Sequence, residues 1–112
     1  SILTNLRKDI DLSLGIVSSN KNPWYNVVTR SHDGLLDPIL SSKVVPFRGQ
    51  DAPPSFDLTS VAFACRPSYV QQTKHLWDGK VGGFEVSREY SVDIDDELDL
   101  RIASCLYEDQ AV

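Results

Sequence analysis

The sequence contains no methionine and only two cysteines, which form no Cys-x-x-Cys pair. Two cysteines are too few for a disulfide scaffold, and without a Cys/His cluster we expect no structural zinc site. Cys65 and Cys105 stand among apolar neighbours, which favours two buried free thiols over a single disulfide. No stretch approaches the roughly 18 apolar residues of a membrane span, so no membrane segment is predicted.

Catalytic and nucleotide-binding signatures are also missing from the sequence. Gly79, Gly82 and Gly83 form neither a P-loop nor a GxGxxG turn, and no GxSxG nucleophile motif occurs. We therefore expect a protein that is not an enzyme and that binds no cofactor. An enzyme without a recognisable motif, with His32 and His75 as acid–base groups, stays open as an alternative.

What is present is ordinary for a small globular protein. The chain has 112 residues, of which 41% are hydrophobic and 24% charged, and this length predicts a single domain over 1–112. The formal charge of −5 argues against a general nucleic-acid binder, because binding to phosphate requires a basic face. We expect no direct contact with nucleic acid.

The acidic excess is confined to the last quarter of the chain. Residues 1–84 carry a net charge of +2, whereas residues 85–112 carry −7. Such a charge distribution can steer a basic partner and exclude wrong ones, although a plain solubilising surface is the simpler explanation. The segment 93–99 is the densest in charge, but Leu98 and Ser104 stand where a calcium-binding EF-hand needs glycine and glutamate. We predict no metal site there.

Periodicity in the first half of the chain favours strands. Apolar residues at helical spacing at the N-terminus give way to alternation, which predicts a short helix followed by a half-buried strand over 9–18. Residues 24–30 are rich in aromatic and β-branched side chains and are expected to pair with that strand as a hairpin. A helical turn is expected over 38–42 and an edge segment over 43–47.

The second half predicts further strands and one helix. Residues 56–65 alternate as a central strand does, and 69–77 with 80–88 are expected to form a hairpin around Asp78–Gly79. A last strand is expected near 90–94. The tail over 96–107 fits a strand or a helix; acidic residues at its start favour the helix. The predicted fold class is β-rich α+β, a mostly antiparallel sheet of five to seven short strands with short N- and C-terminal helices.

Candidate binding residues fall into two groups. The first consists of aromatic and loop residues, because Trp and Tyr supply much of the energy at interfaces and stack on sugars, and because a proline-containing loop loses little entropy on binding. The second is the acidic cluster. The candidates are Trp24, Tyr25, Trp77, Arg48, Asp95, Asp96, Glu97 and Asp99. Core packing of the tryptophans and an ordinary loop around Arg48 remain the simpler alternatives.

These observations favour a structural or assembly subunit that acts through protein–protein contacts. We expect a protein partner, with a homo-oligomer or a larger assembly such as a virion as the product. The alternative is a small ligand- or carbohydrate-binding module that uses exposed aromatic side chains. No positively charged segment followed by an apolar one begins the sequence, so no signal peptide is predicted, and synthesis in the cytoplasm or residence in a virion is favoured.

Overall fold

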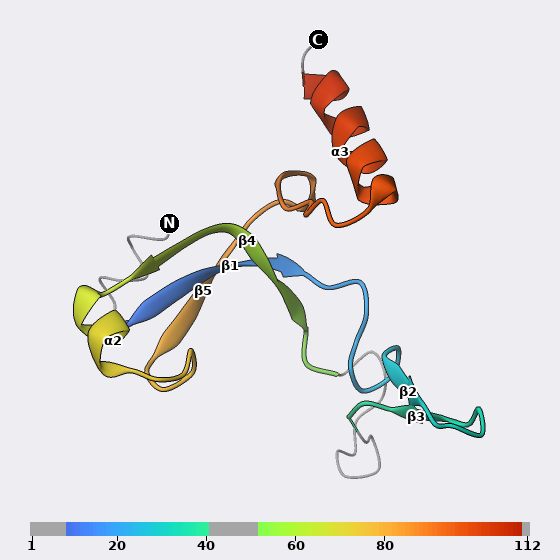
Figure 1. Ribbon diagram of the computed structural model, residues 1–112, viewed down its shortest axis with the longest axis horizontal. Helices are drawn as coiled ribbons and strands as arrows, with labels where there is room; N and C mark the ends of the chain where they lie inside the picture. Colours follow the sequence, from blue (N-terminus) through green and yellow to red (C-terminus); the bar gives the residue numbers. More distant parts are fainter. Residues whose placement is uncertain (1–8, 41–51, 111–112) are drawn as a thin grey trace. The chain divides into compact units, whose positions relative to one another are not determined.

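The computed structural model describes residues 9–40 and 52–110 of the chain (Figure 1). The chain divides into two compact units, one formed by Ser1–Val17 with Leu58–Val112 and the other by Ser18–Asp57. The single domain over 1–112 stays a prediction. The described elements, in order, are β1 (Leu12–Ser18), β2 (Val28–Arg30), β3 (Leu36–Pro38), β4 (Phe56–Cys65), α2 (Pro67–Gln72), β5 (Val81–Glu85), the 3-10 turn η2 (Arg88–Tyr90) and α3 (Glu97–Gln110).

The larger unit is built on a three-stranded sheet in which β1 lies between β4 and β5. The strand predicted over 9–18 is confirmed as β1. Its face with Ser13, Gly15 and Val17 is buried, whereas on the other face Leu12 is buried and Leu14 and Ile16 are only half-buried. A strand with neighbours on both edges has every backbone group in reach of a partner, which makes β1 the organising element of the sheet.

The sheet is mixed, not mostly antiparallel as the sequence suggested. β1 and β5 run parallel, with Leu12 opposite Val81 and Ile16 opposite Glu85. Along β4 the order is reversed: the Arg66 N–H donates to the carbonyl of Asp11 at one end, and Gly15 lies further along against Ala62. The α+β class is therefore confirmed, with five strands in two sheets in the described part of the chain.

Strand β4 confirms the strand predicted over 56–65, but it is an edge strand and not a central one. The predicted hairpin over 69–88 is wrong, because Pro67 at the first helical position starts α2 and Tyr69 is buried against the sheet. The segment 80–88 still yields β5. Without its expected partner, this strand pairs in parallel with β1 instead.

The smaller unit contains an antiparallel hairpin of β2 and β3, in which Val28 pairs with Pro38 and Arg30 with Leu36. Two predictions fail here. The strand over 24–30 shrinks to three residues and does not pair with β1, because Asn22 holds residues 23–26 in a turn; its Oδ1 accepts the Trp24 N–H at 2.9 Å. Of the helical turn expected over 38–42, Pro38 ends β3 and residues 39–40 form a bend, while 41–42 lie outside the residues that the structure describes. Gly34 supplies the positive φ, +91°, that the connecting turn needs.

The C-terminal tail is helical, as its acidic start indicated: α3 runs from Glu97 to Gln110. The strand expected near 90–94 is absent, and η2 is followed there by irregular backbone. Both thiols are free, as predicted. Cys105 is nevertheless exposed on α3 rather than buried, and Cys65 is half-buried. The N-terminal helix, the segment 43–47 and Arg48 fall outside the residues that the structure describes.

Candidate functional site

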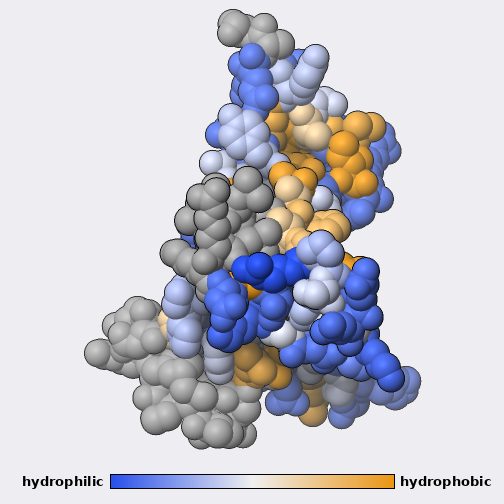
Figure 2. All heavy atoms as spheres, turned by 90° about the vertical axis from the view of Figure 1, so that its left-hand side faces the viewer, coloured by the Kyte–Doolittle hydropathy of each residue, from blue (hydrophilic) through white to orange (hydrophobic). Residues whose placement is uncertain are grey.

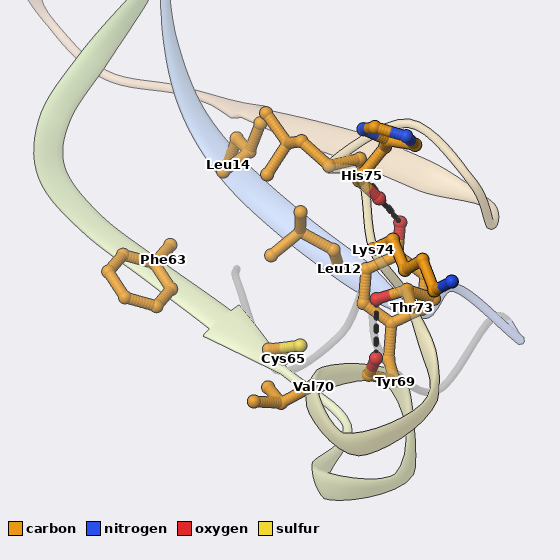
Figure 3. A pocket seen from close by; sticks show the side chains of 10 residues that line it. Leu12, Leu14, Phe63, Cys65, Tyr69, Val70, Thr73, Lys74 and His75 are labelled. Atoms are coloured by element: carbon orange, nitrogen blue, oxygen red, sulfur yellow. Dashed lines mark hydrogen bonds between the residues drawn. The ribbon is translucent and has the colours of Figure 1, made fainter.

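An open apolar groove of about 340 Å³ lies on one face of the larger unit's sheet (Figure 3). Alternation along β1 places Leu12 and Leu14 on the same face, and β4 adds Phe63 and Cys65 beside them. The wall comes from α2 and the segment that follows it. We call this surface the β1–α2 groove; its lining residues are Leu12, Leu14, Phe63, Cys65, Tyr69, Val70, Thr73, Lys74, His75 and Leu76.

Tyr69 holds the wall of the groove in place. Its side chain is only 8% exposed, and its hydroxyl donates to the Leu76 carbonyl and accepts the Gly79 N–H at 3.1 Å. The Thr73 hydroxyl donates back to the Tyr69 carbonyl at the end of α2. The Asp78 carboxylate accepts the His75 N–H at 3.1 Å and so closes the same turn. The wall is therefore a built structure rather than a loose loop.

The groove is strongly apolar and exposed to solvent. Phe63 is 71% exposed and Val70 67% exposed, although both are large hydrophobic side chains. The titratable side chains of the lining are Cys65, Tyr69, Lys74 and His75, and the hydroxyl of Tyr69 is already engaged in the turn. An open apolar surface that includes Lys74 suits a hydrophobic partner better than it suits acid–base chemistry.

A second apolar surface lies on α3. Leu98, Ile102, Cys105 and Leu106 recur at helical spacing and face the same way; we call them the α3 stripe. With Arg101 they line a shallow hollow of about 320 Å³. Leu98 is 60% exposed, and no residue of α3 is buried. In Figure 2 hydrophobic side chains, drawn in orange, reach the surface in the upper part of the view, at the level of α3.

The acidic binding candidates lie at the N-terminal end of α3; they are Asp95, Asp96, Glu97 and Asp99. The Asp96 carboxylate accepts the Asp99 N–H at 2.8 Å, and the Asp99 carboxylate accepts the Asp95 N–H at 3.1 Å. Together these bonds form a capping motif: the Asp99 N–H is one of the backbone donors that the helix itself leaves unpaired, and the Asp95 N–H directly precedes the helix. Glu97 follows in the first turn, where a negative charge complements the helix dipole. Asp96 and Asp99 therefore have a structural role in addition to any role in binding.

The aromatic candidates do not form one cluster within a unit. Trp24 is half-buried and Tyr25 is exposed, and both lie in the turn 23–26 of the smaller unit. Trp77 belongs to the larger unit, is 63% exposed and directly follows Leu76 of the groove. Arg48 lies outside the residues that the structure describes. Trp77 is thus the aromatic candidate that the fold brings next to the groove.

The histidines considered for an enzymatic role also belong to different units. His32 is exposed in the turn between β2 and β3, and His75 is exposed on the groove. Among the residues that the structure describes, no three His, Cys, Asp or Glu side chains are grouped so that they could hold a metal ion. No helix in the described ranges is both long and apolar enough to cross a membrane.

The sequence did not single out the groove as a site. Alternation along 9–18 marks Leu12 and Leu14 as members of one face, and that signal was available. Alternation along 56–65 likewise places Phe63 with Cys65 on one face, but Val70 carries no such signal, because it joins them only once the chain turns from β4 into α2 at Pro67. No model of a known protein family matches the chain, and no curated protein matches it either.

Proposed function

We propose that the chain is a non-enzymatic assembly subunit that associates with further copies through apolar surfaces, as a component of a virion or another oligomeric assembly. The observation that supports this most is the exposure of large hydrophobic side chains on the β1–α2 groove and on the α3 stripe. Single exposed hydrophobic residues are normal, whereas contiguous apolar surfaces typically mark places where a partner binds.

The buried core of the described residues is small for the number of hydrophobic side chains in the chain. Its hydrophobic members are Leu12, Val17 and Tyr69. Burial of each further Leu, Phe or Val side chain contributes about 1.5–3 kcal/mol. A partner that covers Phe63, Val70 and Leu98 would therefore add stability on the scale of a whole small domain. Association would complete a core that one copy leaves open.

The charge distribution supports contact between unlike surfaces. The excess of −7 on residues 85–112 and of +2 on residues 1–84 favours an arrangement in which the tail of one copy meets the body of another. Such attraction weakens as salt screens it, since the Debye length falls from about 10 Å at 0.1 M to about 3 Å at 1 M. Apolar contact does not weaken in this way.

Light scattering across concentration and salt tests the proposal. We expect a mass above the 12.5 kDa of one chain at low salt, with association that weakens but persists as salt rises, because only the charged part of the contact is screened. A strictly monomeric protein at every salt and up to high concentration would refute self-assembly.

A second candidate function is the binding of a small apolar ligand in the β1–α2 groove. Its volume of about 340 Å³ lies at the lower end of the range for small-molecule sites. Trp77 follows the lining residue Leu76, so its fluorescence reports on the groove. Trp24→Phe leaves Trp77 as the only reporter, and Trp77→Phe is the matched control. Quenching by an apolar ligand in the first variant and not in the second would favour this function; no change across a panel would remove it.

A further inference from the structure

We propose that the α3 stripe of one copy docks into the β1–α2 groove of a second copy, in a head-to-tail contact. This inference rests on the proposed assembly function and names the two surfaces that would meet. Both are apolar, both are exposed, and both belong to every copy of the chain. An amphipathic helix laid into a hydrophobic groove is a common mode of recognition, with anchors at i, i+4 and i+7 spacing.

The stripe provides anchors at that spacing. Leu98, Ile102 and Cys105 follow one another at intervals of four and three residues, which places them on one side of α3 over about 10 Å of helix. Leu100 and Tyr107 are exposed as well, but they point to the opposite side of the helix. The groove offers Leu14, Phe63 and Val70 as the complementary apolar wall (Figure 3).

Charge complementarity selects a second copy's groove over a second copy's helix. α3 carries four carboxylates against Arg101, a net charge of −3. The lining of the groove carries Lys74 and no carboxylate, a net charge of +1. A pair of α3 helices would bring two charges of −3 together, whereas a helix in the groove brings −3 to +1. Lys74, in the lining itself, is placed to meet the carboxylates of α3.

Such a contact is heterologous, because it joins two different surfaces. Each copy that uses its groove still offers its α3, and each copy that uses its α3 still offers its groove. A contact of this kind closes into a ring when the rotation between copies permits, and otherwise extends as a filament. The inference therefore predicts more than a dimer, which is the expectation for a subunit of a larger assembly.

The two cysteines allow a direct test, because Cys65 lies in the groove and Cys105 in the stripe. Cys65→Ser retains only the thiol of the stripe, and Cys105→Ser retains only the thiol of the groove. A short bismaleimide, which joins two thiols by adding each across a maleimide double bond, should link the mixed variants into a dimer. Neither variant alone should give that dimer.

A second groove reporter guards against poor access to the half-buried Cys65. Val70→Cys in the double background Cys65→Ser and Cys105→Ser places one exposed thiol at the groove, since Val70 is 67% exposed. This variant should also cross-link to the chain that retains Cys105. A dimer from the Cys105 chain alone would indicate a helix–helix pair, and a dimer from a groove chain alone a groove–groove pair; either result overturns the inference.

Matched substitutions test the energetics. Ile102→Asp removes an anchor from the stripe, whereas Leu100→Asp makes the same kind of change on the opposite side of α3. Val70→Glu places a repelling carboxylate in the groove, and Gln71→Glu adds the same charge to α2 outside the lining. We expect association in light scattering to weaken by at least about tenfold for Ile102→Asp and Val70→Glu, and by much less for their controls.

The outcomes separate this inference from the function on which it rests. Assembly in light scattering without the mixed cross-link, or with equal effects of Ile102→Asp and Leu100→Asp, would overturn the head-to-tail contact and leave an assembly subunit that uses other surfaces. A cross-link within single wild-type chains at high dilution, with no mixed dimer, would mean that α3 fills the groove of its own chain and would also overturn it. A monomer under all conditions would refute both.

Discussion

At the scale of single residues, the hydroxyls of Thr59 and Thr73 in the larger unit affect stability in opposite directions. Thr59 Oγ1 is buried and has no hydrogen-bond partner in the described part of the chain, and it lies against Gly15. The Thr73 hydroxyl, by contrast, donates to the carbonyl of Tyr69. A buried hydroxyl without a partner lowers stability, whereas a satisfied one raises it.

Substitution of each threonine by valine, which has nearly the same shape, should therefore change stability in opposite directions. We expect Thr59→Val to stabilise the protein by about 1 kcal/mol, and Thr73→Val to destabilise it by about 0.5–1.5 kcal/mol. Urea unfolding at a fixed low protein concentration measures both. A loss of stability in Thr59→Val would show that its hydroxyl is satisfied in solution.

Asp33 in the β2–β3 turn provides a prediction that depends on pH. The hydroxyl of Ser31 donates to its carboxylate, and this hydrogen bond, with that of its own backbone N–H, lowers the pKa of Asp33 below its ordinary value. Because the folded pKa is depressed, the stabilisation of the turn is present above the ordinary pKa of about 3.9 and is lost as pH falls through the lowered value.

We expect Ser31→Ala to raise the pKa of Asp33 towards its ordinary value, as measured by an NMR titration of the carboxyl carbon. Ser91→Ala is the control, because its hydroxyl donates to the Arg88 carbonyl in the other unit. The control should leave the titration of Asp33 unchanged. A wild-type Asp33 that titrates at or above about 3.9 would contradict the hydrogen bond as described.

At the scale of elements, the start of α3 is where the sequence was most informative. Acidic residues at 95–99 predicted a capped helix, and the capping motif of Asp96 and Asp99 explains why the alternating pattern of Leu98, Leu100 and Ile102 did not produce a strand. A helix of 14 residues is marginal by itself in water, so its cap contributes a large part of its stability.

Asp96→Ala should therefore reduce the helicity of α3, with a loss of about 1 kcal/mol of helix stability. Asp95→Ala is the matched control, because Asp95 contributes a backbone N–H to the motif that alanine retains. Far-UV circular dichroism of the two variants measures the difference. Equal loss of helical signal in both would mean that the charge of the cluster, and not the hydrogen bond to the Asp99 N–H, supports the helix.

Other elements could not be predicted from the sequence, because their local sequence pattern favours one structure and their contacts in the folded unit impose another. Asp78–Gly79 is a strong hairpin signal, yet β5 finds its partner in β1, which lies more than 60 residues earlier in the chain. The segment 69–77 contains residues that favour strands, but Pro67 and the burial of Tyr69 make it begin as a helix. Pairings of this kind depend on contacts across the whole unit, which periodicity within one segment does not report.

At the scale of the whole molecule, the candidate site was also only partly predictable, because it depends on contacts between segments that are distant in the sequence. Trp77 and the acidic tail were identified from residue type alone, and they lie beside the groove and at the start of α3. The groove itself joins residues from 12 to 76. The contrast in net charge between residues 1–84 and 85–112, however, could be read from the sequence alone, because net charge is a sum over residues and does not depend on the fold. This contrast became informative once the structure placed an apolar surface in each of the two charged parts.

Head-to-tail assembly makes the stability of the whole molecule depend on its concentration. A partner that binds only the folded state stabilises it by mass action, by up to about 1.4 kcal/mol for each tenfold rise in concentration above the dissociation constant. For a chain of this length we expect Tm to rise by several degrees per decade of protein concentration. Differential scanning fluorimetry over three decades of protein concentration measures this rise in Tm.

Ile102→Asp should flatten the dependence of Tm on protein concentration, and Leu100→Asp should preserve it. The wild-type Tm could stay constant over concentrations at which the mass measured by light scattering rises. That result would mean that association does not cover the apolar surfaces that destabilise the single copy.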